Sequence, residues 1–369
     1  MSTEIPGWDR LAPTPADALI LHIGLFKTGT TAVQSALNAS RKSLRSHGIE
    51  FRGPVSWKYQ PLRAVMAEKG PRWQGLHRAI ATPTGRSMVS GENMCTFDND
   101  QASEIISELA VGRPVRVLMT ARPIADLVPS TWQQDLRQRP ATTESYESWL
   151  AEVTHNNGPA GERFWARNDL VKLLERWGGL VGEENVIVVM TDKNDPERTL
   201  RVVERLTDLP EQTLTLSRDG RSNPSRTFEE AEFLHAVYEE AAANLDQQQF
   251  RSLIRFGLTP AVVRSPVSPG SKIPLLRSAA DAFAAAGQQQ ATKLAESSAI
   301  AVGDLKRLGD VSVPVVDTLT PPTEVPIDVA VAAVMGAISA MPPTQPPATG
   351  RSGRLRSRLR RLGRGRSAN

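Results

Sequence analysis

The sequence has one cysteine, few aromatic residues and no long apolar run. A lone Cys95 excludes an intramolecular disulfide and a thiolate metal cluster, which is compatible with a reducing compartment. No stretch approaches the roughly 18 apolar residues that span a bilayer, and residues 1–17 lack the basic and apolar regions of a secretion signal. We therefore expect a soluble cytoplasmic protein, whose 40% hydrophobic residues are enough for a sizeable core.

Excess basic charge is confined to one end of the chain. The 44 Lys and Arg against 40 Asp and Glu give a net charge of +4, but residues 351–369 hold eight arginines and no acid. Without these eight, 36 basic residues face 40 acidic ones, about −4, so no nucleic-acid surface is expected on the folded body. Leu355, Leu359 and Leu362 recur among the arginines. The tail is expected either to be disordered or to lie, peripherally, on an anionic membrane or acidic polymer.

Short apolar runs alternate with helical patterns in the first part of the chain. The runs are at 19–23, 88–89, 115–119 and 186–190, and the helical patterns are at 31–46, 102–110 and 170–177. This alternation predicts an α/β fold with a central, mostly parallel sheet flanked by helices. In such sheets ligands bind outside the carboxyl ends of the strands, so the residues that follow each run are the candidates for chemistry.

Beyond Leu209 and Pro210 the strand patterns fade and a mostly helical region is expected. Thr227 followed by Glu230 predicts a capping box that opens a helix ending near Ala243. Another helix is expected over residues 279–299, interrupted near Gly287. The expected organisation is an N-terminal extension (1–17), a main domain (18–310, with its core at 18–210 and a helical part at 211–310), a Pro-rich segment and linker (311–350), and an Arg-rich tail (351–369).

The segment 19–31 is the most informative part of the sequence. A buried strand, a loop between Gly24 and Gly29, and a helix start follow one another, and a helix N-terminus offers unpaired N–H groups to a phosphate or sulfate. The glycine spacing and Thr31 match a nucleotide triphosphatase loop, G-x-x-x-x-G-K-[ST], but the lysine has moved three residues earlier, to Lys27. A loop lysine commonly faces solvent. The surrounding glycines and threonines favour anion binding instead.

A second anion site is expected after the run 115–119. Arg122 stands at the end of this strand, and Ser130 follows eight residues later, about two turns along a helix. A guanidinium offers a fork of donors to a phosphate, and the hydroxyl reaches the same group. The alternative is that Arg122 pairs with Asp126 on the surface. A triphosphatase would usually place a magnesium-binding aspartate near a strand end here, and since none is present, no metal is expected.

The segment after the run 88–89 supplies a candidate general base. In a parallel sheet Glu92 points into the same cleft as Lys27, where a carboxylate removes a proton from an acceptor hydroxyl. A loop or helix-capping acid is the alternative, and His77 is the alternative base. His22 lies within the buried strand and is expected to be a core histidine.

Together these motifs resemble the sulfotransferases that use 3′-phosphoadenosine 5′-phosphosulfate (PAPS), particularly a bacterial branch with the opening H-I-G-x-x-K-T-G-T-T, matched here by residues 22–31. The resemblance extends over residues 18–243. It implies an architecture like that of P-loop nucleotide hydrolases, PAPS as co-substrate without a metal, and transfer of a sulfuryl group to a hydroxyl or amine.

The resemblance also implies roles for individual residues. Lys27 would stabilise the bridging oxygen as the sulfuryl group leaves, and Glu92 would be the base. One departure is that Pro123 directly follows the arginine, where many members have one residue between them. The residues expected to bind the 5′-phosphosulfate of PAPS are Lys27, Thr28, Gly29, Thr30 and Thr31, and those expected at the 3′-phosphate are Arg122 and Ser130. Arg221 and Asn223 are expected in a loop that closes over the nucleotide. The alternative for this loop is an ordinary interdomain turn.

The acceptor is expected by analogy to be a carbohydrate or glycan, with a small hydroxylated metabolite as the second choice. Aromatic side chains stack on sugar rings and phenols alike, so they do not separate the two. Two other classes of function remain. One is a P-loop kinase or triphosphatase, against which the order of the loop residues argues. The other is a catalytically inactive nucleotide-binding scaffold that docks partners through its tail.

Overall fold

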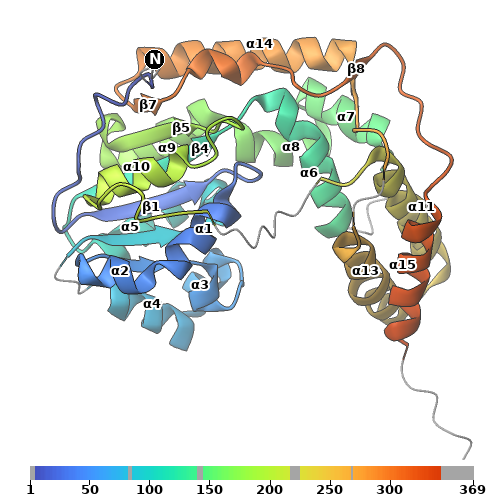
Figure 1. The fold of residues 1–369 in the computed structure, drawn as a ribbon, viewed down its shortest axis with the longest axis horizontal. Helices are drawn as coiled ribbons and strands as arrows, with labels where there is room; N and C mark the ends of the chain where they lie inside the picture. Colours follow the sequence, from blue (N-terminus) through green and yellow to red (C-terminus); the bar gives the residue numbers. More distant parts are fainter. Residues whose placement is uncertain (1–4, 82–84, 139–143, 217–224, 267–268, 342–369) are drawn as a thin grey trace, which may run out of the picture. The chain divides into compact units, whose positions relative to one another are not determined.

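The computed structural model describes residues 5–81, 85–138, 144–216, 225–266 and 269–341 (Figure 1). The chain divides into two compact units. Unit 1 consists of residues 1–239 and 267–326, and unit 2 consists of residues 240–266 and 327–369. The Arg-rich tail, expected either to be disordered or to lie on an anionic membrane or acidic polymer, is outside the described residues.

Unit 1 is built on a six-stranded sheet in which all the strand pairs are parallel. Its strands, in spatial order, are β2 (Glu50–Arg52), β3 (Ser87–Ser90), β1 (Leu19–Gly24), β4 (Val115–Ala121), β5 (Val186–Met190) and β7 (Ile300–Val302). The expected parallel α/β sheet is confirmed. Because the strand order reverses on either side of β1, the crevice outside the carboxyl end of β1 is where such a sheet binds ligands.

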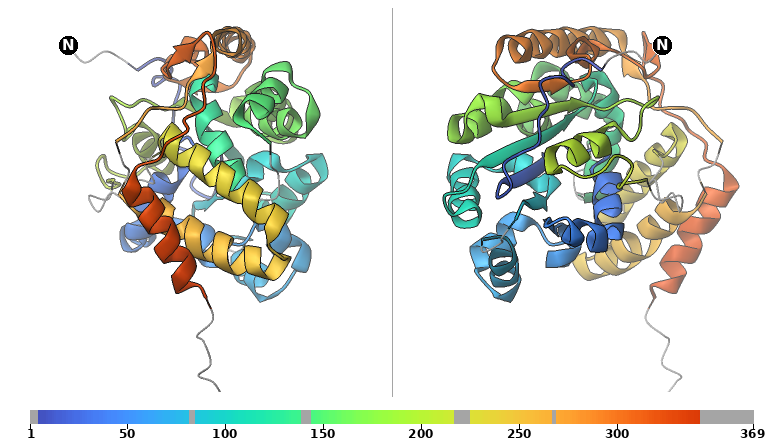
Figure 2. Two further views of the ribbon diagram at one scale, coloured as in Figure 1. Left: turned by 90° about the vertical axis from the view of Figure 1, so that its right-hand side faces the viewer. Right: turned by 60° about the vertical axis from the view of Figure 1, so that its left-hand side comes forward.

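Helices cover both faces of this sheet (Figure 1, Figure 2). Leu19, Leu21 and Ile23 alternate with Ile20 along β1 and enter two different buried clusters, as the two-residue period of a strand requires. The first cluster is completed by α5 (Asn99–Ala110) and α9 (Leu170–Val181), and the second by α1 (Thr30–Ala39) and α10 (Arg198–Thr207). Burial on both faces explains why the strands read as continuous apolar runs.

Other elements complete unit 1 and make up unit 2. In unit 1 they are η1 (Pro54–Trp57), α3 (Leu62–Glu68), α4 (Pro71–Ala81), η2 (Glu92–Thr96), α6 (Ile124–Gln138), α7 (Tyr146–His155), α8 (Gly158–Asn168), η3 (Glu183–Asn185), and the ladder of β6 (Leu275–Leu276) with β8 (Val315–Val316). In unit 2 they are α12 (Gln247–Gln249), η4 (Phe250–Leu258), α13 (Thr259–Arg264) and α15 (Ile327–Ser339). Within the described ranges, no helix is long and apolar enough to cross a membrane.

Two helix predictions were accurate to different degrees. The expected helix over 31–46 is two helices, α1 and α2 (Arg41–Ser46), because the chain turns at Ser40, a residue type that favours caps over helix interiors. The capping box at Thr227 is confirmed. The Thr227 amide donates to Glu230 Oε2 (3.0 Å), the Glu230 amide donates to Thr227 Oγ1 (3.2 Å), and α11 (Phe228–Asn244) follows.

The interruption expected near Gly287 is wrong, since α14 (Arg277–Glu296) is continuous. Gly287 instead lies where η5 (Leu305–Gly309) crosses the helix, and a Cβ there would be 2.1 Å from the Leu308 carbonyl oxygen. The glycine therefore serves close packing and not a helix break.

Two elements of the second half were not expected. Strand β7 pairs with β5 at one edge of the sheet, but its three residues are too few to show a pattern. Helix α15 lies within the segment 311–350, expected to be a Pro-rich linker, and it packs against η4 so closely that a Cβ on Gly257 would be 2.8 Å from the Gly336 carbonyl oxygen. The prolines of this segment flank the helix without entering it, and residues 342–350 lie outside the described residues.

The substitution Gly287→Ala should lower the melting temperature. Its Cβ meets backbone, which cannot move as a side chain does, so we expect an overpacking cost of about 1–3 kcal/mol in the free energy of unfolding. The matched control is Gly179→Ala on α9, where a Cβ meets nothing within 4 Å and better helix propensity should stabilise by up to about 1 kcal/mol. Calorimetry or thermal circular dichroism measures both, and equal shifts would contradict the packing role of Gly287.

Candidate functional site

The loop between β1 and α1 has an unusual backbone held by its own side chains. Lys27 and Gly29 have φ angles of 62° and 85°, in the left-handed region that lysine rarely adopts. The hydroxyls of Thr28 and Thr30 both donate to the Leu25 carbonyl oxygen, at 2.7 and 3.0 Å. These hydrogen bonds fix the loop and so maintain the strained conformation at Lys27.

The N-terminus of α1 is left open toward this loop. Gly29 is the N-cap residue, no described side chain caps the helix, and the first turn contains no acidic residue. Thr28 and Thr30 are buried, while Thr31 is exposed on the first turn. The unpaired N–H groups and the positive end of the helix dipole are therefore available to an anion.

A cavity of about 260 Å³ lies against the open end of α1. The loop contributes Lys27, Thr28 and Gly29 to its lining, and the segment that follows β4 contributes Arg122. The residues after β5 form another wall, where Arg307 donates to Asp192 at 2.6 Å. The cavity thus lies at the carboxyl ends of β1, β4 and β5, the position that the strand order indicates.

Arg122 takes part in both of the interactions considered for it. Its Nη2 lies 3.6 Å from Asp126 Oδ2, the expected alternative pair, and its Nη1 donates to the Lys27 carbonyl oxygen at 3.5 Å. The buried Asp126 also accepts from the Ser312 amide (2.9 Å) and lies 3.8 Å from Lys193 Nζ. Arg122 is thus held at the cavity wall by one carboxylate and one carbonyl oxygen.

Other expected binding residues are less directly placed. Ser130 is buried on α6, its hydroxyl donates to the Leu127 carbonyl oxygen (2.9 Å), and it is not among the residues that line the cavity. The structure therefore brings Arg122, but not the Ser130 side chain, to the cavity wall. Arg221 and Asn223 lie outside the described residues.

Glu92 lies against the end of β1 because Gly24 has no side chain. Glu92 opens η2 directly after β3, and a Cβ on Gly24 would be 3.0 Å from Glu92 Cα and 3.2 Å from Glu92 Cβ. Burial raises the pKa of Glu92, and the positive charge of Lys27 lowers it in part. A half-buried carboxylate beside a cation, with a raised pKa, is suited to accept a proton.

Positive charge is in excess around Lys27. Burial lowers the pKa of Lys27 to about 8, the charges of Arg137 and Arg122 lower it as well, and Glu92 raises it. Two cations therefore lower the pKa of Lys27, and one carboxylate raises it. A bound anion would reduce this repulsion and favour the protonated lysine.

Arg137 was missed by the sequence analysis. It is half-buried near the end of α6, burial lowers its pKa, and its effect on the pKa of Lys27 exceeds that of Arg122. Ser130 and Arg137 are seven residues apart, so they share one face of α6. That spacing was the available indication in the sequence.

The two histidines have different surroundings. His22 is buried in β1, its Nδ1 lies 2.9 Å from Ser90 Oγ, and burial lowers its pKa to about 4. His77 lies on α4, where its charge acts on Glu108 of α5. The two candidate bases are Glu92 and His77, and of these Glu92 is the one whose charge acts on Lys27.

Comparison with solved structures, but not with family models or curated proteins, finds similarity. No protein-family model and no curated protein matches the chain. A solved structure, that of a sulfotransferase from Alicyclobacillus acidocaldarius, is 16% identical with a TM-score of 0.38, over 63% of this chain and 98% of that one. Among the described residues there is no group of three or more His, Cys, Asp and Glu arranged to hold a metal.

The affinity of the loop for sulfate should depend on pH. Because the pKa of Lys27 is about 8 and a bound anion raises it, affinity should fall as the pH rises above about 8, by up to about tenfold per pH unit for one linked proton. Sulfate is a suitable probe since it does not titrate in this range. Isothermal calorimetry at pH 7, 8 and 9 measures the slope.

The control for this measurement is Lys27→Arg, which keeps its charge throughout the range. Its sulfate affinity should vary little between pH 7 and 9. An equal slope in both proteins would mean that another group controls the binding.

Proposed function

We propose that the protein is a PAPS-dependent sulfotransferase that moves a sulfuryl group to a hydroxyl or amine of an acceptor and leaves 3′-phosphoadenosine 5′-phosphate (PAP). The observation that carries this proposal is the meeting of Lys27, Arg122 and Glu92 at the carboxyl ends of three neighbouring strands. An open helix N-terminus with a lysine placed before it, and not after the second glycine, suits a sulfuryl donor better than a triphosphate.

In this proposal Lys27 and α1 stabilise the leaving group. The phosphosulfate lies against the first-turn amides of α1, and the Lys27 ammonium faces the oxygen that bridges phosphorus and sulfur. As the bond from that oxygen to sulfur breaks, negative charge grows on the oxygen, and fixed donors already in place stabilise it. Burial and the nearby arginines lower the pKa of Lys27, and a bound anion would favour its protonated form.

Glu92 is proposed to take the proton of the acceptor hydroxyl. The acceptor oxygen forms its bond to sulfur from the side opposite the leaving oxygen, and its proton passes to the carboxylate. The close approach of Gly24 sets the backbone of Glu92 beside the loop, so positioning contributes as well as basicity.

Arg122 is proposed to bind the 3′-phosphate, with Arg137 adding positive charge nearby. The acceptor is proposed to be a hydroxylated molecule, and a glycan is our first choice. Two alternatives remain. One is a kinase or triphosphatase, and the other is a scaffold that binds the nucleotide without transferring a group. The experiments below separate the three.

Arg122→Gln should reduce discrimination for the 3′-phosphate. The wild type is expected to bind PAP more tightly than AMP or ATP, and loss of a charged donor should reduce the preference for PAP over AMP by about tenfold. Thermal shift and calorimetry measure the affinities, with Lys293→Gln, an exposed site on α14, as the matched control. A wild type that prefers ATP would favour the kinase alternative.

Lys27→Ala and Glu92→Gln should each lower transfer of labelled sulfate from PAPS by about a hundredfold or more, since they remove charge stabilisation and the base. The Glu92→Gln variant should still bind PAP, because the carboxylate is placed on the acceptor side. Assays use a panel of oligosaccharide and phenol acceptors, and circular dichroism checks the fold. Near-normal turnover in Lys27→Ala would refute its role, and binding without transfer to any acceptor would favour the scaffold.

A further inference from the structure

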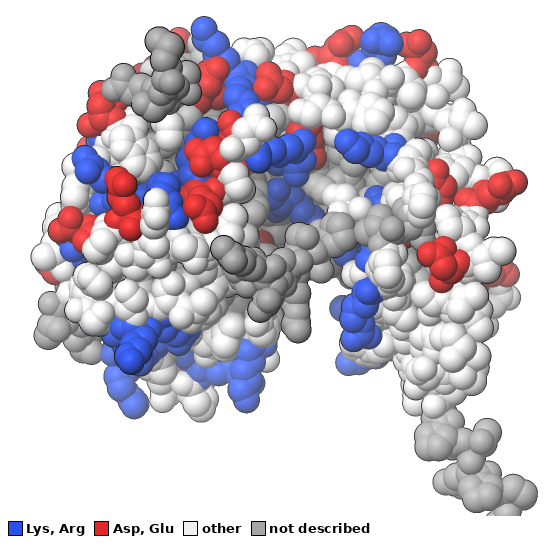
Figure 3. All heavy atoms as spheres, viewed as in Figure 1, with Lys and Arg blue, Asp and Glu red and all other residues white. Residues whose placement is uncertain are grey.

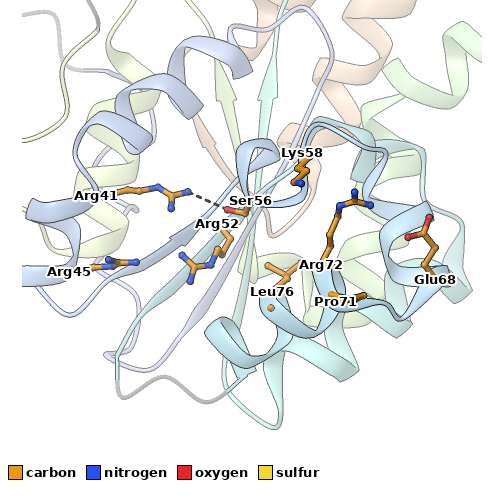
Figure 4. A pocket seen from close by; sticks show the side chains of 10 residues that line it. Arg41, Arg45, Arg52, Ser56, Lys58, Glu68, Pro71, Arg72 and Leu76 are labelled. Atoms are coloured by element: carbon orange, nitrogen blue, oxygen red, sulfur yellow. Dashed lines mark hydrogen bonds between the residues drawn. The ribbon is translucent and has the colours of Figure 1, made fainter. Parts of the chain in front are cut away.

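A second cavity, of about 790 Å³, lies beside the edge strand β2 (Figure 4). Its walls come from α2, the end of β2, η1, α3 and α4. Glu68 is the one acidic residue of the lining. The basic residues of the lining are Arg41, Arg45, Arg52, Lys58 and Arg72.

Much of this positive charge has no acidic partner. Among the described residues, no carboxylate lies within ion-pairing distance of Arg41, Lys58 or Arg72. Arg41 donates instead to neutral groups, the Asn38 side-chain oxygen (3.0 Å) and the Ser56 hydroxyl (3.3 Å). Neutral acceptors orient a guanidinium but leave its charge in place.

The remaining cations of the cavity share a single acid. Arg45 lies 3.4 Å from Glu50, and Arg52 pairs with the same carboxylate. Burial and the positive charges of Arg52 and Arg45 lower the pKa of Arg41, and the charge of Glu50 raises it in part. Figure 3 shows Lys and Arg side chains gathered over this part of unit 1 with little acidic surface between them, although the body of the chain is mildly acidic.

The cavity opens at the same edge of the sheet as Glu92. β2 and β3 are parallel and Arg52 is paired with Val89, so the end of β2 lies beside the segment that leads into Glu92. A Cβ on Gly91 would be 3.6 Å from both Trp57 and Leu62, which shows that η1 and α3 pack against the residue before Glu92. The order β2-β3-β1-β4 places Glu92 between this cavity and the one at Lys27.

We propose that this cavity binds acidic groups of the acceptor, so that the acceptor is an oligosaccharide bearing sulfate, phosphate or carboxylate groups and not a neutral one. This proposal rests on the proposed function of the Lys27 site. Five cations line a volume larger than one small anion fills, and two acids lie near them, Glu68 in the lining and Glu50 beside Arg45 and Arg52. The remaining positive charge matches a ligand with several acidic groups. The hydroxyl to be sulfated then extends from the cavity along the sheet edge to Glu92.

The test compares size-matched, fluorescent dextran oligosaccharides that are neutral, carboxymethylated, phosphorylated or sulfated, bound to the full chain. At least one acidic probe should bind about tenfold or more tightly than the neutral one, and added salt should weaken it. The three acidic arms identify the group preferred. Lys58→Gln with Arg72→Gln should weaken that probe by about tenfold or more and leave PAP binding unchanged.

The matched control neutralises Lys272 and Lys293, which are exposed and outside both cavities. Probe binding that is independent of charge, equal losses in the control and the cavity variant, or displacement of the probe by PAP would each overturn the proposal. A wild type that binds acidic dextran but neither PAP nor PAPS would instead overturn the proposed function, and the acceptor role with it.

Discussion

The hydrogen bonds around Leu25 are the interactions on which the candidate site depends. They tie the loop to itself through Thr28 and Thr30, and they tie it to the neighbouring strand, since the Leu25 amide donates to the Thr120 carbonyl oxygen at 3.2 Å. The Thr28 and Thr120 hydroxyls also hydrogen-bond to each other. Because Thr120 is two residues before Arg122, the loop that presents Lys27 and the strand that presents Arg122 are fixed relative to each other.

A constraint on charge accompanies this constraint on geometry. Both cavities at the carboxyl edge of the sheet are lined by more cations than acids, whereas the chain without its Arg-rich tail is mildly acidic. Mutual repulsion of that kind costs stability in the free protein and is relieved by anions. Sites of this type are organised for ligands, and the folded chain tolerates them because the large buried clusters on both faces of the sheet hold it together.

The sequence predicted the parts of the fold and site that depend on local pattern. Continuous apolar runs located β1, β4 and β5, and residues at their ends included Lys27 and Arg122. Other features depend on contacts between segments far apart in the chain. The pairing of β7, the close approach at Gly287, and the basic cavity drawn from several short elements leave no local pattern to read.

The expected role of Ser130 shows the limit of spacing as evidence. Its position two helical turns beyond Arg122 suggested a shared ligand, yet in this structure its hydroxyl is bonded to the preceding turn of its own helix. Arg137 shares that helix face and is the residue whose charge acts on Lys27. The spacing places both residues on one helix face, and a binding role for Ser130 stays a prediction.

The contact between Gly24 and Glu92 has a consequence for how the site is built. It joins backbone to backbone across two strands, with no side-chain rotamer between them to absorb a change. The separation between the anion loop and the backbone of Glu92 is therefore a property of the sheet itself. Loops and side chains around the edge can vary in sequence and select different ligands. The distance between the anion loop and the backbone of Glu92 would stay the same.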